Sequence, residues 1–341
     1  MLISRSSFFT ALLLLSGLLS LPSCGDDAKD PATAPAPAPK IERKVDPNAK
    51  PIPRFDADSA YAFVAKQVAF GPRVMNTPAH DATGEWLVGK LKSFGAEVEE
   101  QKFTATAYDG TPLKGNNIIG RYNPDDEYRI VLAAHWDTRH VADQTDDPNA
   151  VVEGADDGAS GVGVLLEIAR HLGQSTPNIG VDIVFFDAED YGEGGRSNNT
   201  DSWGLGSQHY GKNIKAPKPQ YGILLDMVGA KNARFGREGY STRNAGALVD
   251  KVWKLAKGLP ISAAYFTDEQ LPPLTDDHYF FMRESGVPMI DIIFYSSTNT
   301  RGFGDHWHTG NDGMDIIDKN TLRAVGQVVA AVVYREAAGT F

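Results

Sequence analysis

Several acidic residues and one histidine near the C-terminus border apolar runs of this 341-residue chain. They are Asp157, the neighbouring acids Glu189 and Asp190, Asp226, and His308. Apolar runs of this length are typical of buried strands, and polar residues that follow such strands can meet at one edge of a sheet. Carboxylates and a histidine gathered there could hold a metal ion. The pattern therefore predicts metal-assisted chemistry.

The adjacent acids Glu189 and Asp190 are the hardest of these residues to explain by structure alone. They closely follow an apolar run that ends at Phe186. Two like charges about 4 Å apart repel each other by about 4 kcal/mol at a surface-like effective dielectric constant of about 20. A bound cation would remove that repulsion, and a solvated turn is the structural alternative. The second acid could then bind the metal while the first remains free for proton transfer.

Two further motifs allow both a chemical and a structural interpretation. His135 and Asp137 follow an apolar stretch, where His135 could be a metal ligand oriented by a carboxylate, or Asp137 could simply fix the loop. Asp157 lies in the glycine-rich segment 154–161 ahead of a helical pattern, which Asp157 or Ser160 could cap. Capping and metal binding are compatible, because one carboxylate has two oxygens.

Asp226, Asp276 and His308 carry little weight when each is taken singly. Asp226 ends an apolar run, Asp276 lies in a loop after two prolines, and His308 lies in a polar loop near the C-terminus. Acids in such places are commonly turn or cap residues. A site assembled from several strand ends would give all three a shared purpose.

Apolar periodicity predicts the elements that would position these residues. Strands are predicted at 98–103, 118–120, 129–134, 181–186, 221–225 and 288–294. Helices are predicted at 60–65, 77–94, 162–172, 245–257 and 322–338. This alternation predicts a single α/β domain with a mixed, mostly parallel central sheet flanked by helices, which binds ligands beyond the carboxyl ends of its strands.

The N-terminal segment 1–23 has the features of an export signal. One positive charge precedes an apolar stretch at 8–19, and the following Leu-Pro-Ser-Cys at 21–24 resembles the lipobox of bacterial lipoproteins. We expect the mature protein to begin at Cys24, the only cysteine of the chain. Acyl chains on Cys24 would then anchor it to a bacterial membrane, and we expect this to be an outer membrane. A free thiol near an ordinary cleavage site is the alternative.

The composition of the remaining chain indicates its domain boundaries and the kind of partner that it can bind. Residues 24–54 are rich in proline and alanine without apolar periodicity, which predicts a flexible tether, and 55–341 form the predicted catalytic domain. A net charge of −11 makes the protein a poor nucleic-acid binder, because phosphate contacts require a basic face. We expect a monomer that contacts the membrane only through its lipid anchor.

Taken together, these segments resemble the zinc-dependent aminopeptidase superfamily and, within it, the animal-type glutaminyl cyclases, or glutaminyl-peptide cyclotransferases. The resemblance covers about 70–338. Five superfamily motifs carry it: the histidine-aspartate motif at 135–137, the Gly-Ala-x-Asp loop at 154–157, the acidic pair at 189–190, Asp226, and the His-Thr pair at 308–309. Features typical of the cyclase branch are 224–230, Asp-Asp-His at 276–278, Gly-Val-Pro at 286–288, and Trp307 before the late histidine.

The resemblance implies a role for each candidate residue. One catalytic zinc ion would be held by Asp157, Asp190 and His308, with Glu189 as the general acid/base. Asp226 and Asp276 would form a supporting hydrogen-bond network, and Trp307 would line the substrate pocket together with Trp203. The implied substrates are peptides or proteins with an N-terminal glutamine, which would be converted to pyroglutamate with release of ammonia. The animal enzymes usually carry Glu where this chain has the shorter Asp190.

Two alternatives remain open. In a two-zinc aminopeptidase of the same superfamily, His135 and Asp226 would hold a second metal ion, Asp157 would bridge the two ions, and Glu189 would activate a water molecule. In a non-catalytic surface lipoprotein, the fold would serve as a binding module, but all the implied ligands and the acid/base are present.

Overall fold

The computed structural model describes residues 43–147, 149–195, 199–299 and 302–341. The predicted signal segment 1–23, the predicted lipidation site Cys24 and the tether up to residue 42 lie outside these ranges. None of the described helices combines the length and the hydrophobicity needed to span a bilayer.

The described end of the predicted tether, 43–54, contacts the domain although it contains no helix or strand. Arg43 donates hydrogen bonds to the carbonyl oxygen of Ala337 (2.9 Å) and to the side chain of Asn178 (3.0 Å). The amide of Asp46 donates to the carbonyl oxygen of Ala338 (3.0 Å). The chain is therefore held at the C-terminal end of the domain before the first helix begins.

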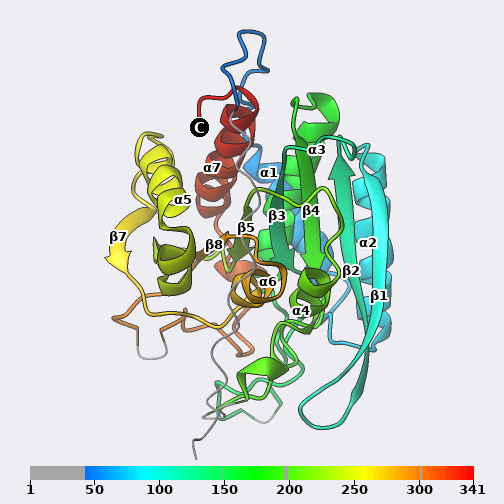
Figure 1. Cartoon of the computed structure of the whole chain (residues 1–341). Helices are drawn as coiled ribbons and strands as arrows, with labels where there is room; N and C mark the ends of the chain where they lie inside the picture. Colours follow the sequence, from blue (N-terminus) through cyan, green and yellow to red (C-terminus); the bar gives the residue numbers. More distant parts are fainter. Residues whose placement is uncertain (1–42, 148, 196–198, 300–301) are drawn as a thin grey trace, which may run out of the picture. The chain divides into compact units, whose positions relative to one another are not determined.

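A six-stranded mixed sheet forms the centre of the domain (Figure 1). In spatial order its strands are β1 (Glu97–Thr106), β2 (Pro112–Tyr122), β4 (Gly180–Phe186), β3 (Arg129–His135), β5 (Gly222–Asp226) and β8 (Met289–Ile293). The strands β4, β3, β5 and β8 are parallel, and β1 and β2 are antiparallel at one edge. The predicted mixed, mostly parallel sheet is confirmed.

Helices cover both faces of this sheet. One face packs against α1 (Ala57–Val68), α2 (Pro78–Ser93), α3 (Ala159–Gln174), α5 (Gly239–Lys257) and α7 (Lys319–Ala337). Along β3, Ile130, Leu132 and Ala134 belong to that core, while Val131 and Ala133 belong to the core on the opposite face. Side chains alternate in this way because successive residues of a strand point to opposite faces.

The opposite face packs against two short helices that the sequence analysis did not predict, α4 (Leu205–Lys212) and α6 (Asp277–Ser285). A small second sheet, β6 (Phe235–Arg237) and β7 (Phe266–Gln270), was also not predicted. The short 3₁₀ turns η1 (Thr200–Ser202) and η2 (Met314–Ile316) complete the described elements. In Figure 1, α5 lies beside the β8 edge and α2 beside the β1 edge.

The predicted starts of the first two helices are explained by their caps. Asp56 accepts hydrogen bonds from the amides of Asp58 and Ser59, and Thr77 accepts one from the amide of His80. Such caps satisfy amides that have no partner within the helix. The predicted start of the helix at 245 corresponds to a kink, since Ala245 has non-helical backbone angles inside α5.

The parallel strands bring the predicted site residues to one edge of the sheet. His135 is the last residue of β3 and Asp226 is the last residue of β5, while Glu189 follows the end of β4. The carboxyl ends of parallel strands lie at the same edge, so the loops after these strands meet there. This is the lower end of the sheet in Figure 1, near α4.

Candidate active site

A cavity of about 920 Å³ lies at this edge of the sheet. Its floor carries carboxylates that the sequence analysis singled out: Asp157, Glu189, Asp190, Asp226 and Asp276. Apolar side chains form part of its walls, beside polar ones such as Gln144 and Thr275: Trp203, Met227, Leu274, Ile293, Phe303 and Trp307. Buried acids below apolar walls are typical of an enzyme site, because a small number of polar groups directs a ligand that the walls hold.

The side chains of Asp157, Asp190 and His308 form a cluster that fits a metal ion. One donor atom from each of the three lies within 4.8 Å of the other two. His308 Nε2 is 3.1 Å from Asp190 Oδ1 and 3.6 Å from Asp157 Oδ2. Asp157 Oδ2 and both carboxylate oxygens of Asp190 are buried without a hydrogen-bond partner. A cation would compensate these buried oxygens, and two carboxylates with one imidazole are a zinc ligand set.

Two residues that the sequence analysis missed orient His308. Its Nδ1 atom is 3.0 Å from Asp143 Oδ1, and Asp143 in turn accepts a hydrogen bond from Arg139 (2.6 Å). Arg139 also donates to the carbonyl oxygen of Asp190 (3.0 Å). A carboxylate bound to one imidazole nitrogen directs the other nitrogen towards the metal. Asp143 lies in a polar loop, where no periodic pattern distinguishes it from its neighbours.

Two further buried carboxylates hold the loops that carry the candidate ligands. Asp137 accepts hydrogen bonds from the amides of Glu189 (3.2 Å) and Asp190 (3.1 Å). It does not line the cavity, and its Oδ1 atom also lies 3.5 Å from His135 Nδ1. Both predicted roles of Asp137, fixing the loop and orienting His135, therefore fit the structure. Asp312, which the sequence analysis missed, accepts hydrogen bonds from the amide of Asp157 (3.1 Å) and from the preceding amide (2.7 Å).

His135 lies between the candidate metal cluster and Asp226. Its Nε2 atom is 3.0 Å from Asp157 Oδ1 and 3.2 Å from Asp226 Oδ1. These three residues also have donor atoms within 4.8 Å of one another, as a second metal site would require. One hydrogen bond joins two of these donor atoms, His135 Nε2 and Asp226 Oδ1. None of the three atoms is an unpaired buried atom, whereas Asp157 Oδ2 and both carboxylate oxygens of Asp190 in the first cluster are.

Glu189 has the environment of a proton-transfer group. Burial raises its pKa well above the ordinary value, and the nearby charge of Asp190 adds to the shift although His135 opposes it. Burial likewise raises the pKa of Asp226 to about 8, with Asp276 contributing. A carboxyl group whose pKa is shifted towards neutrality can both accept and donate a proton at physiological pH.

Asp276 and the two tryptophans occupy the places expected of supporting residues. Asp276 caps α6 through the amide of Asp277, and its other carboxylate oxygen is buried without a partner. The ring of Trp307 stacks on His308 at 3.8 Å between centroids, and the ring of Trp203 lies parallel to His308 at 6.2 Å. The structure thus brings all the predicted cavity residues together, while their chemical roles remain predictions.

Backbone strain is concentrated at this site. Six described residues other than glycine have a positive φ, and three of them are asparagines, which tolerate that region. The other three are Ala188 (φ 54°), Met227 (φ 46°) and His308 (φ 54°). Ala188 precedes the proposed acid/base, Met227 follows Asp226, and His308 is itself a candidate ligand. Such residues cost about 1 kcal/mol or more each, and the surrounding structure must hold them in place.

The turn after Asp157 requires glycine. Gly158 has a φ of +91°, and a Cβ atom there would lie 2.8 Å from the carbonyl oxygen of Asp137 and 3.0 Å from the ring of His135. Gly158 is also the N-terminal cap residue of α3, which has no side-chain cap. The suggested caps Asp157 and Ser160 are therefore wrong: Asp157 faces the cavity, and the Ser160 hydroxyl donates to the Asp156 carbonyl oxygen (2.6 Å).

Comparison with known proteins agrees with this geometry. Residues 117–333 match Peptidase family M28. The chain belongs to this family. A crystal structure of Porphyromonas gingivalis glutaminyl cyclase is 51% identical, with a TM-score of 0.80, and the alignment covers 83% of this chain and 99% of that one.

Two other proteins similar to this M28 chain are named after different activities. A Zn-dependent exopeptidase from Parabacteroides distasonis is 49% identical with a TM-score of 0.80, over 83% of this chain and 99% of that chain. The glutaminyl-peptide cyclotransferase of Drosophila melanogaster is 26% identical, over 76% of this chain and 75% of the relative.

Proposed function

We propose that this M28 protein is a zinc-dependent glutaminyl-peptide cyclotransferase, which converts the N-terminal glutamine of peptides and proteins to pyroglutamate and releases ammonia. One observation carries the proposal: the unpaired buried oxygens of Asp157 and Asp190 lie beside His308 and the acid/base candidate Glu189 in one apolar-walled cavity. The 51% identity to a glutaminyl cyclase over nearly the whole domain supports it.

The chain's own residues can carry the proton that this reaction moves. When held by Asp157, Asp190 and His308, a zinc ion supplies Lewis acidity towards the side-chain amide carbonyl of the glutamine. Glu189 accepts a proton from the substrate's α-amine as its nitrogen forms a bond to the amide carbon. The bond from that carbon to the amide nitrogen then breaks, and Glu189 returns the proton to the departing ammonia. No water is consumed.

The cavity walls favour cyclisation over hydrolysis. The rings of Trp203 and Trp307 are half-buried and line the cavity, where they can pack against the methylene groups of a glutamine. A glutamine packed against these rings would displace water, the competing nucleophile, from the reacting atoms. Asp226, at the end of β5, can accept a charge-assisted hydrogen bond from the substrate's α-amine.

A single zinc ion accounts best for the hydrogen bonding. The unpaired oxygens belong to Asp157 and Asp190, whereas His135 Nε2 is already partnered by Asp226. Elemental analysis of the active protein is expected to find one zinc per chain. Two zinc ions per chain would favour the alternative in which His135 and Asp226 hold a second metal ion.

The direct test is incubation of the purified protein with a peptide that begins with glutamine. We expect release of ammonia, together with the loss of one ammonia from the peptide mass, and we expect a chelator to abolish both. Peptides that begin with other residues are the control. Release of free N-terminal amino acids without pyroglutamate would instead identify an aminopeptidase.

We also propose that the protein is exported and anchored to the outer membrane through acyl chains on Cys24, and that it acts as a monomer. The support is the signal-like segment 1–23 and its lipobox-like end. Metabolic labelling with a fatty acid is expected to label the protein and to fail in Cys24→Ser, which should leave the membrane fraction. Equal labelling of both forms would contradict the anchor, and light scattering of the purified protein tests the monomer.

A further inference from the structure

We propose that His80 is a positioning residue: together with Asp187 it holds the loop at 187–190 in the geometry that places Glu189 and Asp190 in the site. The roles of those two acids rest on the proposed function. The contact between His80 and Asp187 rests only on the fold, and it links the first turn of α2 to the loop after β4.

Asp187 holds the start of this loop in place through its hydrogen bonds. It is fully buried, and its Oδ1 atom is 2.9 Å from His80 Nε2. The same oxygen accepts a hydrogen bond from the amide of Ala188 (2.9 Å), and Oδ2 accepts one from the amide of Asn116 (2.7 Å). The amide of Asp187 donates to Asn117 Oδ1 (3.0 Å). Both carboxylate oxygens are therefore partnered, and His80 provides the side-chain donor.

His80 is itself fixed on both sides. Its amide donates to the hydroxyl of Thr77, which caps α2 (3.3 Å). Its ring stacks on Trp136 with 4.2 Å between centroids and 19° between planes. Trp136 stands between the two site residues His135 and Asp137 in the sequence, and its indole nitrogen donates to the carbonyl oxygen of Asn116 (3.3 Å). A ring held in this way presents Nε2 to Asp187 without free rotation.

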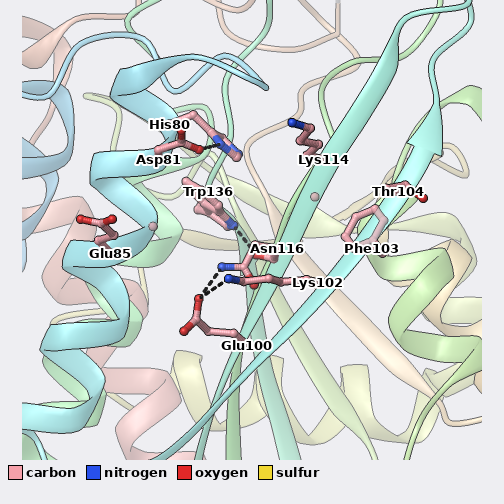
Figure 2. Close-up of a pocket in the computed structure, with 12 residues that line it drawn as sticks. His80, Asp81, Glu85, Glu100, Lys102, Phe103, Thr104, Lys114, Asn116 and Trp136 are labelled. Atoms are coloured by element: carbon pink, nitrogen blue, oxygen red, sulfur yellow. Dashed lines mark hydrogen bonds and ion pairs between the residues drawn. The ribbon is translucent and has the colours of Figure 1, made fainter.

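His80 does not contact the substrate site. Figure 2 shows His80 and Trp136 in a groove of about 640 Å³ between α2 and the strands β1 and β2. None of the residues that line this groove lines the catalytic cavity. An effect of His80 on the reaction must therefore pass through the residues that it contacts, Asp187 and Trp136, and only Asp187 belongs to the loop.

The loop needs such a restraint because it is strained. Ala188, between Asp187 and Glu189, has a φ of 54°. A residue with a Cβ atom leaves that region when its surroundings permit it. Loss of the His80 donor leaves the buried Asp187 held by amides alone, so the loop can relax against its remaining restraint, the hydrogen bonds from the amides of Glu189 and Asp190 to Asp137. Relaxation would move Glu189 and Asp190 together, because they follow Ala188 directly.

The test compares His80→Leu with His80→Gln, whose amide nitrogen can still donate to Asp187. We expect His80→Leu to lower kcat about 10- to 100-fold with a smaller change in KM, and to weaken zinc binding in competition with a chelator by a similar factor. His80→Gln is expected to restore most of both. His171→Leu is the matched control: it removes another buried histidine 2.9 Å from a carboxylate, that of Glu167, remote from the loop.

Each result bears on the proposal. Wild-type kcat and zinc affinity in His80→Leu, equal losses in His80→Leu and His80→Gln, or equal losses in His80→Leu and His171→Leu would each overturn it. If His80→Leu does not fold, His80→Phe removes the same hydrogen bond while keeping a ring against Trp136, and unchanged zinc affinity there has the same meaning. Zinc affinity also separates the two hypotheses: a wild-type protein without cyclase activity refutes the proposed function, while the zinc competition still tests His80.

Discussion

At the scale of single residues, three aspartates around the cavity use their carboxylate oxygens in three different ways. Asp137 uses both carboxylate oxygens to bind backbone amides, and Asp190 leaves both unpaired. Asp157 divides them, with Oδ1 near His135 and Oδ2 unpaired. Only the unpaired oxygens are available to a metal ion. Residue type alone therefore does not assign a role to an acid of this site.

Glu189→Gln tests the proton carrier. The amide keeps the shape of the side chain but cannot accept a proton, so kcat is expected to fall by about 10²- to 10⁴-fold. Zinc content and thermal stability should be retained, because the pKa of Glu189 is raised by burial and a neutral side chain suits that environment. Ammonia release measures the expected fall in kcat, and elemental analysis measures the retained zinc content. Full activity in this variant would remove Glu189 from the mechanism.

Asp143→Asn tests the residue that orients His308. The substitution weakens the contact with His308 Nδ1 and leaves Arg139 without its nearest anionic partner. Loss of such a partner typically weakens metal binding about 10- to 100-fold. Chelator competition measures the change. Asp146→Asn, an exposed acid on the same loop, is the matched control, and equal effects in both variants would contradict the assignment.

At the scale of elements, strands that are buried on both faces could be predicted and short amphipathic pieces could not. The strands β3, β4, β5 and β8 are buried throughout and mostly apolar, with Asp182 and Asp291 as internal exceptions, so both their positions and the residues at their ends were predicted. The helix α4 has only eight residues, two of them glycines, and β7 is mostly polar. Their formation depends on the surfaces they pack against.

The same distinction applies to the site. Glu189 and Asp226 were recognisable because they follow buried strands. Asp143, Asp312 and His80 lie in loops or at a helix start, and their partners are far away in the sequence. Contacts over such separations leave no local pattern. The sequence therefore predicted the groups that can act on a substrate but, of the buried carboxylates that hold their loops, only Asp137.

The start of α5 provides a prediction about pH. Glu238 caps this helix through the amides of Tyr240 (2.8 Å) and Ser241 (2.6 Å), and His278 Nε2 lies 2.9 Å from its carboxylate. Burial opposes its charge, yet these hydrogen bonds lower the pKa of Glu238 to about 2. Because the folded pKa lies below the unfolded one, the resulting stability is present above about pH 4.5 and is lost as the pH falls towards 2.

Glu238→Gln is expected to reduce the free energy of unfolding by about 3 kcal/mol at pH 7. The difference from wild type should shrink as the pH falls below about 4.5, where the wild-type carboxylate begins to protonate in the unfolded chain. Urea unfolding of both proteins at pH 7 and pH 3 measures it. A difference that does not change with pH would show that the cap acts through shape rather than charge.

At the scale of the whole molecule, metal binding and folding should be coupled. An ion that binds the folded chain but not the unfolded chain adds about 2.7 kcal/mol of stability when its free concentration is 100 times Kd. Chelation is expected to lower Tm and added zinc to restore it. Asp190→Asn removes a candidate ligand, so its Tm should not respond to either treatment. A wild-type Tm that is insensitive to chelation would contradict a bound metal in this cavity.

The contacts of Arg43 and Asp46 determine where the chain enters the domain. Both residues bind the end of α7, and Arg43 also binds Asn178, which precedes β4. This is the amino edge of the parallel strands, whereas the cavity opens at their carboxyl edge (Figure 1). No residue of the described segment 43–54 lines the cavity, so the mouth of the cavity is clear of the part of the chain that leads into the domain. Bulky protein N-termini as well as free peptides could then reach the cavity without displacing this segment.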